Sequence, residues 1–176
     1  VDGPGEGLIA AISSVMGGKR VIAEDLGIVI PEVGRMLKRS GYPGMKLMQF
    51  GFDSGPDNEY LPCHYDKNVV VYGGTHDNET LAGFFAHQPC RVLRFARAYL
   101  GVRTSREIPW ALIRAGYASS ADTAVFQMQD LLGLGNEARM NTPSTIGENW
   151  RWRLAEGQLT SGTARKLREL AELYGR

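Results

Sequence analysis

The stretch VVVYGGTHDN, residues 69–78, decides the fold and carries the strongest sign of a functional site. Its first four residues are apolar and three of them are valines, which predicts a buried strand over residues 69–72. The two glycines that follow let the backbone turn tightly. We therefore expect His76 and Asp77 to point into a pocket at the end of this strand.

A simpler role is also open to the polar end of this stretch. Asp77 or Asn78 can cap a helix that begins at Glu79, because their side-chain oxygens accept hydrogen bonds from free backbone N–H groups. The two interpretations are compatible, with Asn78 capping the helix and Asp77 lying in the site.

Strand and helix signals alternate on both sides of this stretch. Strands are predicted at residues 21–23, 45–50, 69–72 and 123–128, and helices at residues 10–16, 31–39, 79–86, 90–100, 109–117 and 159–174. This alternation is typical of βαβ units around a parallel sheet, so the predicted fold class is α/β. Four strands cannot close an eight-stranded barrel. The chain is therefore either an open sheet or half of a barrel whose other half lies upstream.

The composition is that of a globular protein of one domain. The 176 residues are 43% hydrophobic and 22% charged, with a net charge of +1. No block of basic residues suggests nucleic acid or an anionic membrane as a partner, and no apolar run approaches a membrane span. Cys63 and Cys90 are expected to be free thiols, and the expected location is the cytoplasm.

A second candidate carboxylate follows the first predicted strand. Glu24 comes directly after residues 21–23, and the carboxyl end of a barrel strand faces the active site. From the residues alone, a solvated or helix-entering pair with Asp25 is favoured over a catalytic role. Carboxylates at the ends of two parallel strands nevertheless suggest glycosidic chemistry, which uses a pair of carboxyl groups. A metal site is disfavoured because His64, His76 and His87 are scattered.

Several motifs together resemble glycoside hydrolase family 77. In chain order they are VIAEDLG at residues 21–27, PGMKLMQF at 43–50, VVYGGTHDN at 70–78, QDLLGLG at 129–135, ARMNTP at 138–143 and NWRWR at 149–153. The family's enzymes are 4-α-glucanotransferases on a (β/α)₈ TIM barrel of the α-amylase type. The resemblance implies that residues 1–176 are a single domain, the C-terminal half of that barrel with strands five to eight, and that the upstream half is missing.

The resemblance also assigns roles to particular residues. Glu24 corresponds to the general acid/base, and Asp77 to the carboxylate that stabilises the transition state. His76 corresponds to the histidine that binds sugar hydroxyls in subsite −1, while Asn141 and Asp25 resemble further substrate contacts. The family's nucleophilic aspartate lies in an Arg-x-Asp-His type motif that does not occur here, so it is expected upstream. No metal and no cofactor are implied.

The implied substrates are α-1,4-glucans: maltooligosaccharides, amylose, glycogen or starch. A segment would pass to the 4-hydroxyl of another glucan or of glucose by a retaining double displacement. The isolated chain is expected to be inactive, and to self-associate or to need the N-terminal half. Rival interpretations are a starch hydrolase or branching enzyme, against which the ARMNTP and NWRWR motifs argue, and a truncated product or a module that works with a partner chain.

Two further expectations concern aromatic and loop residues. Trp150, Trp152 and Tyr42 are candidates for stacking on sugars, but a core role is favoured for the two tryptophans. The loop that often reads Leu-Pro-His-Asn in the family has Cys63 and His64 at its last two positions, which leaves the role of His64 open.

Overall fold

A three-stranded parallel sheet forms the centre of the protein in the computed structural model, which describes residues 3–27 and 30–176. The strands are β1 (Gly44–Leu47), β2 (Val69–Tyr72) and β3 (Thr123–Val125), in the order β1-β2-β3. Met45 pairs with Val70, and Val70 pairs with Thr123. The predicted α/β class with parallel strands is therefore confirmed for this part of the chain.

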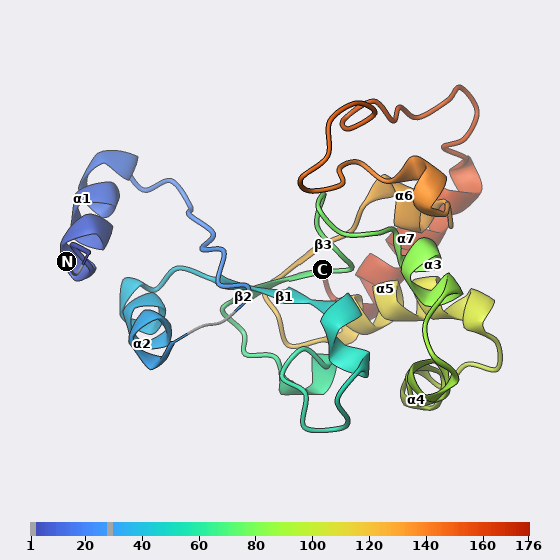
Figure 1. Ribbon diagram of the computed structural model, residues 1–176, viewed down its shortest axis with the longest axis horizontal. Coiled ribbons are helices and arrows are strands. Elements are labelled where there is room, and N and C mark those ends of the chain that lie inside the picture. The colour runs from blue at the N-terminus through green and yellow to red at the C-terminus, as the bar shows by residue number, and fades with distance from the viewer. Residues whose placement is uncertain (1–2, 28–29) are drawn as a thin grey trace.

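Helices connect and cover the strands (Figure 1). They are α1 (Glu6–Met16), α2 (Pro31–Ser40), α3 (Leu81–Ala86), α4 (Cys90–Leu100), α5 (Ile108–Ala118), α6 (Met128–Leu131) and α7 (Ser161–Tyr174). Short 3₁₀ turns lie at Met48–Phe52, Pro62–His64, Ser105–Glu107 and Asn136–Ala138. The predicted helices are confirmed, with α1 beginning earlier than expected and α4 matching residue for residue.

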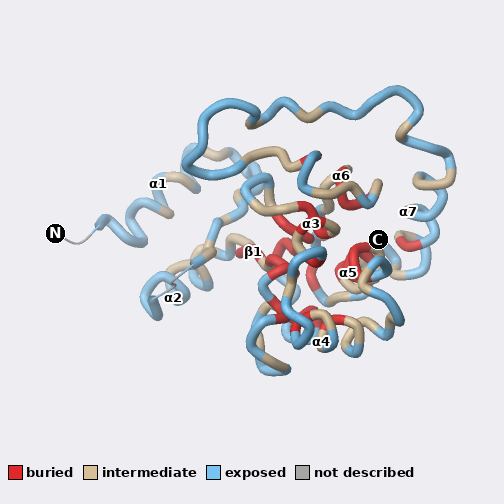
Figure 2. The backbone as a smooth tube through the Cα atoms, turned by 45° about the vertical axis from the view of Figure 1, so that its right-hand side comes forward, coloured by how far each residue is buried: buried red, intermediate tan, exposed pale blue. Residues whose placement is uncertain are grey.

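The apolar core lies on one face of the sheet. Side chains alternate between the faces of a strand, and Val69 and Val71 point to the face where α3, α4, α5 and α7 pack. Figure 2 shows that buried residues gather around β1, α3 and α5, whereas α1 and α2 are not buried. The opposite face carries Met45, Val70 and Val125, and Val125 remains 43% exposed at the outer edge of the sheet.

Helices α1 and α2 form a separate pair on one side of the sheet (Figure 1). Arg39 of α2 forms an ion pair with Glu6 of α1, and the Ser13 hydroxyl lies 2.6 Å from the Tyr42 hydroxyl. Neither helix buries a residue. The two polar contacts join the helices, and apolar side chains such as Ile12 and Leu37 are half-buried.

The strand predicted at residues 21–23 is wrong. This segment is extended beside β1, and the Ala23 N–H donates to the Pro43 carbonyl at 2.9 Å, but no ladder forms. Pro43 has no N–H to return, and the Met45 N–H donates to the Asp25 carboxylate at 2.7 Å instead of to a backbone carbonyl. A side chain has therefore taken the place of the next ladder bond.

Two other predicted strands are shorter than expected. The segment at residues 45–50 leaves the sheet after Leu47, and the one at residues 123–128 leaves it after Val125. Both end opposite Tyr72, the last residue of β2, because a parallel ladder extends only as far as its central strand.

Candidate active site

His76 and Asp77 lie in a tight turn just beyond the carboxyl end of β2. The Asn78 side-chain oxygen accepts hydrogen bonds from the Thr75 N–H at 2.8 Å and from the Thr75 hydroxyl at 2.7 Å. The Asn78 N–H donates to the Thr75 carbonyl at 3.1 Å, which closes the turn. The side chains at its tip are half exposed, at 49% for His76 and 48% for Asp77.

The helix cap predicted at Asp77 or Asn78 is wrong. Helix α3 begins at Leu81, and the Thr80 hydroxyl caps it by accepting a hydrogen bond from the Gly83 N–H at 3.1 Å. Asn78 is not available for this role because Thr75 occupies its side-chain oxygen. Asp77 is likewise outside the helix, and its carboxylate contacts Asn141 and His76 instead.

Three of the predicted site residues are in direct contact. The Asn141 side-chain amide donates to the Asp77 carboxylate at 2.6 Å, and the His76 Nε2 lies 3.3 Å from the same oxygen. The Asn141 backbone N–H also donates to the His76 carbonyl at 3.2 Å. Residues far apart in the sequence thus present a carboxylate, an imidazole and an amide together, a set that can bind neighbouring hydroxyl groups.

Glu24 shares a hollow with His76 at the carboxyl ends of the strands. This hollow, which we call the strand-end hollow, has a volume of about 420 Å³ and is lined by Glu24, Tyr72, His76, Val125, Gln127 and Met140, among others. A carboxyl group and an imidazole therefore face one space, beside the apolar side chains of the open sheet face.

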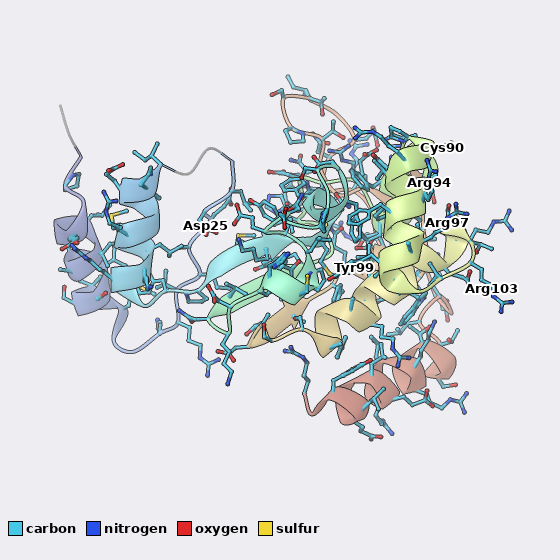
Figure 3. All side chains as sticks on the ribbon, turned by 90° about the horizontal axis from the view of Figure 1, so that it is seen from below. Asp25, Cys90, Arg94, Arg97, Tyr99 and Arg103 are labelled. Atoms are coloured by element: carbon cyan, nitrogen blue, oxygen red, sulfur yellow. The ribbon has the colours of Figure 1, made fainter. Side chains whose placement is uncertain are left out.

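Asp25 points away from this hollow. Its carboxylate accepts the Met45 N–H, and it lines a different depression between α2 and β1, together with Tyr42 and Tyr60. Figure 3 shows Asp25 close to β1. The structure therefore gives Asp25 a positioning contact at the start of β1 and does not bring it together with His76 and Asp77.

Two glutamines that the sequence did not single out, Gln49 (buried) and Gln127 (half-buried), hold the loop carrying His76 and Asp77. The Gln127 amide donates to the carbonyls of Gly74 at 2.9 Å and Thr75 at 2.6 Å, and the Gln49 amide donates to the Glu79 carbonyl at 2.7 Å. Each glutamine lies two residues beyond a strand. A polar residue two positions beyond an apolar strand was the available signal.

The glycines of the loop are needed for close packing and not for a left-handed turn. Neither Gly73 nor Gly74 has a positive φ angle. A Cβ atom on Gly74 would lie 2.9 Å from the Gln49 amide nitrogen, and one on Gly73 would lie 3.2 Å from an Asp130 carboxylate oxygen. These glycines were predicted to allow a sharp turn. In the structure they instead leave room for two buried side chains, Gln49 and Asp130.

Asp130 is a fully buried carboxyl group below this loop. One oxygen accepts the Leu81 N–H at 2.7 Å, and the other has no hydrogen-bond partner among the described residues. Burial raises the pKa of Asp130 to about 6, and the hydrogen bond from Leu81 offsets only part of this effect. The folded protein thus favours the neutral form of this group.

Replacing Asp130 by asparagine is expected to change how stability depends on pH. Because its folded pKa is raised, the wild-type protein loses stability as pH rises from the unfolded pKa through about 6, by about 2–3 kcal/mol in all. Asp130→Asn cannot ionise and should not show this loss. Urea unfolding at about pH 4, 5, 6 and 7 measures the difference.

The matched control for this experiment is Asp122→Asn, because Asp122 is an exposed aspartate at the start of β3. Its stability should follow the wild-type curve. A constant offset between Asp130→Asn and wild type across the whole range would show that Asp130 does not titrate differently on folding.

Trp150 lies against the His76 ring at the surface. Its ring centroid lies 5.1 Å from that of His76 at an interplanar angle of 37°. The Trp150 backbone N–H donates to the Met140 carbonyl at 2.6 Å. Trp150 is 55% exposed, so the core role favoured from the sequence is wrong. Its backbone has a φ of +66°, which is uncommon for a residue with a side chain and is held by this hydrogen bond.

The two cysteines, and the loop that contains Cys63 and His64, lie outside the site. Cys63 and Cys90 are exposed free thiols, as predicted. A ring nitrogen of His64 lies 2.8 Å from the Pro56 carbonyl oxygen, so this side chain braces its own loop. Figure 3 shows that Cys90 comes from α4, together with Arg94 and Arg97.

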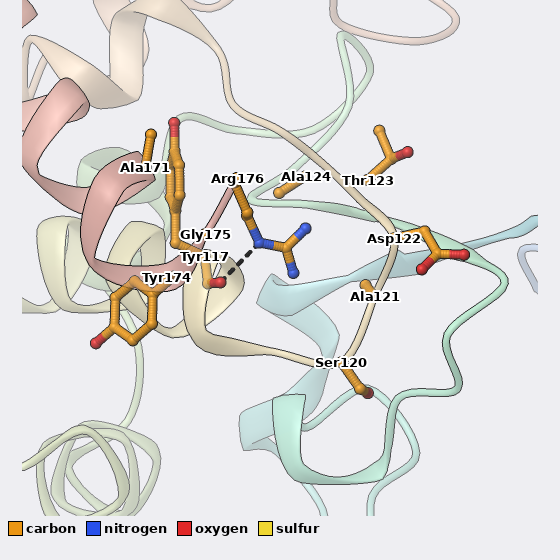
Figure 4. Close-up of a pocket in the computed structure, with 10 residues that line it drawn as sticks. All are labelled: Tyr117, Ser120, Ala121, Asp122, Thr123, Ala124, Ala171, Tyr174, Gly175 and Arg176. Atoms are coloured by element: carbon orange, nitrogen blue, oxygen red, sulfur yellow. Dashed lines mark hydrogen bonds between the residues drawn. The ribbon is translucent and has the colours of Figure 1, made fainter.

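Another hollow, of about 550 Å³, lies at the opposite end of β3 (Figure 4). It is lined by Tyr117, Asp122, Tyr174 and Arg176, among others, and contains none of the predicted site residues. The Arg176 guanidinium donates to the carbonyls of Tyr117 and Ser119, both at 2.7 Å. These contacts dock the end of α7 on α5 and suggest a structural role.

Within residues 3–27 and 30–176, no three His, Cys, Asp or Glu side chains gather closely enough to hold a metal ion. In the same part of the chain, no helix combines the length and apolar character that a membrane span requires.

Comparison with known proteins identifies the family. A family model described as 4-alpha-glucanotransferase, glycoside hydrolase family 77, matches residues 1–160. The 4-alpha-glucanotransferase of Thermus thermophilus is 44% identical, over 98% of this chain and 36% of its own length. The chloroplastic/amyloplastic 4-alpha-glucanotransferase of Arabidopsis thaliana is 42% identical, over 99% of this chain and 31% of its own. The chain thus spans about a third of the length of these relatives.

A solved structure agrees with this result. The amylomaltase of Streptococcus agalactiae, solved in complex with acarbose, superposes with a TM-score of 0.93 at 36% identity, over 100% of this chain and 36% of that one. The family motifs and the parallel sheet therefore lie in the stretch of chain that superposes on a known amylomaltase. The chain belongs to glycoside hydrolase family 77, the family of the 4-alpha-glucanotransferases.

Proposed function

We propose that the full-length protein containing this chain is a 4-α-glucanotransferase that acts on α-1,4-glucans. The observation that carries the proposal is the arrangement at the strand ends, where Glu24 and His76 share a hollow and Asp77 is bonded to Asn141. The names of the relatives support the same activity. Maltooligosaccharides, amylose, glycogen and starch are the substrates we infer.

The reaction we infer is a double displacement that retains the anomeric configuration. Protonated Glu24 gives its proton to the leaving oxygen while an aspartate from outside these residues attacks the anomeric carbon and forms a glycosyl-enzyme. The 4-hydroxyl of an acceptor glucan then attacks that carbon and displaces the aspartate, and ionised Glu24 takes up the hydroxyl proton.

Asp77 and His76 have their largest effect in the transition state. The ring of the reacting sugar becomes oxocarbenium-like, and a carboxylate close to it stabilises the growing positive charge. The contact between His76 and Asp77, at 3.3 Å, keeps the imidazole beside this carboxylate, where it can bind a sugar hydroxyl. We assign Asn141 to the same substrate-binding group.

We further propose that residues 1–176 form one domain, the C-terminal half of a (β/α)₈ barrel. In this arrangement β1, β2 and β3 are strands six, seven and eight, and the extended segment at residues 21–23 takes the place of strand five. The support is the sheet face carrying Met45, Val70 and Val125, whose side chains lie outside the core cluster that the helices pack on; Met45 and Val70 are buried, and Val125 is exposed. Barrel interiors are filled from such faces, and barrel sites lie at the carboxyl ends of the strands.

Product analysis with maltotriose tests the proposal. The full-length protein is expected to form glucose and maltopentaose without a net gain in reducing ends, because each bond broken is replaced by another. The isolated 176 residues are expected to form neither, since the nucleophile would be missing. A rise in total reducing ends would indicate a hydrolase, and α-1,6 bonds would indicate a branching enzyme.

Full activity of the isolated chain would contradict the assignment of strands and of the missing nucleophile. Its mass in solution, measured alongside, tests whether it self-associates through the open edges of the sheet. The cytoplasmic location stays a prediction, because the Arabidopsis relative is named as chloroplastic/amyloplastic.

A further inference from the structure

Arg139 joins the two segments that carry Asp77 and Asn141. One terminal nitrogen of its guanidinium donates to the Asp77 carbonyl at 2.6 Å, and its Nε donates to the Asn141 carbonyl at 2.9 Å. The side chain thus binds the backbone of both residues whose side chains form the 2.6 Å carboxylate–amide contact.

The guanidinium geometry makes this a rigid connection. Its N–H donors lie in one plane at fixed angles, so two acceptors bound to it are held at a fixed mutual position. Among the described residues Arg139 forms no ion pair, and both of its hydrogen bonds go to backbone carbonyls. Arg139 therefore binds the backbone of the site and does not neutralise a neighbouring acidic side chain.

Two further backbone hydrogen bonds support the connection. The backbone N–H of Asn141 donates to the His76 carbonyl at 3.2 Å, and the backbone N–H of Trp150 donates to the Met140 carbonyl at 2.6 Å. Residues 139–141 thus lie against the His76–Asp77 turn through backbone and side-chain contacts. Within the turn itself the Asp77 N–H donates to the Thr75 hydroxyl at 3.3 Å, and it is Arg139 that binds the Asp77 carbonyl from this segment. Losing Arg139 would free the Asp77 carbonyl and leave the turn tied to this segment through the contacts of Asn141.

We propose that Arg139 is a positioning residue for the transfer reaction, fixing the Asp77 carboxylate and the Asn141 amide relative to the reacting sugar. The inference rests on the proposed function. A displacement of a catalytic group by about 1 Å can cost about 100-fold in rate. Because Arg139 acts through Asp77, its removal should affect turnover more than the binding of the glucan.

The test uses Arg139→Gln and Arg139→Lys in the full-length enzyme with maltotriose. We expect Arg139→Gln to lower kcat by about 10–100-fold and to change KM by less than about threefold. Arg139→Lys should lie between this variant and wild type, because one ammonium group keeps the charge but cannot bind both carbonyls in one plane. Thermal unfolding of each variant shows whether the fold is intact, and the lysine variant remains informative if the glutamine variant unfolds.

Arg151→Gln is the matched control. Arg151 lies on the same C-terminal loop, but among the described residues its guanidinium binds the Glu148 side chain alone, and both side chains are exposed. Its kcat and KM should stay within about twofold of wild type.

A double mutant separates positioning from a general structural role. In an Asp77→Asn background, adding Arg139→Gln should lower kcat by less than about threefold, since the group it positions is already disabled. Multiplication of the two losses would overturn the inference, as would a wild-type kcat in Arg139→Gln or a loss confined to KM. Failure of the proposed function has a different signature, which is the absence of transfer by the wild-type enzyme.

Discussion

Replacement of Glu24 by glutamine in the full-length enzyme is expected to lower disproportionation of maltotriose by at least about 10²–10⁴-fold. The amide has the same shape but cannot donate or accept the catalytic proton in either half of the reaction. Glu24 is exposed at the rim of the strand-end hollow, so the change should leave folding almost unaffected. Initial rates of glucose release, with thermal unfolding alongside, measure both effects.

Glu32→Gln is the control for this variant. Glu32 is an exposed glutamate on α2 whose carboxylate pairs with Arg35 at 2.6 Å, and the pair contributes little to stability. Its activity should equal that of wild type. If Glu24→Gln kept more than about a tenth of wild-type activity, Glu24 could not be the general acid/base.

Asp77→Asn is expected to lower kcat nearly as strongly as Glu24→Gln, while KM changes by less than about tenfold. The negative charge is needed mainly when the sugar ring becomes positively charged, so ground-state binding suffers less. The asparagine oxygen can still accept the hydrogen bond that the Asn141 amide now gives to the carboxylate at 2.6 Å. The geometry of the turn should therefore survive, and the charge is what is removed.

Steady-state kinetics on maltotriose provides the measurement, with Asp122→Asn as the control at the far end of β3. Asp122 is exposed and lines the hollow shown in Figure 4. The kcat and KM of the Asp122→Asn variant should therefore match those of wild type. A variant at position 77 with an unchanged kcat and only a raised KM would reduce Asp77 to a residue that binds glucan.

The sequence by itself determined the elements whose signals are local. The valine run of β2 has the composition of a buried strand. Cys90–Leu100 has the apolar spacing of a helix, and a glycine follows it where the helix ends. The motifs also identified the family and selected His76, Asp77 and Asn141, which the structure brings into contact. The residues alone favoured a solvated or helix-entering pair for Glu24 and Asp25, and it was the family resemblance that assigned Glu24 to the site, where it shares the strand-end hollow with His76.

Only the tertiary structure decided which of several local options each residue takes. Asp25 accepts the Met45 N–H and so ends the ladder that the apolar residues before it predicted, while Asn78 binds Thr75 and leaves the helix cap to Thr80. Trp150 lies on His76 at the surface because a hydrogen bond to Met140 fixes its backbone there. A polar side chain can satisfy several partners with similar free energy, and which partner is within reach depends on segments distant in the chain.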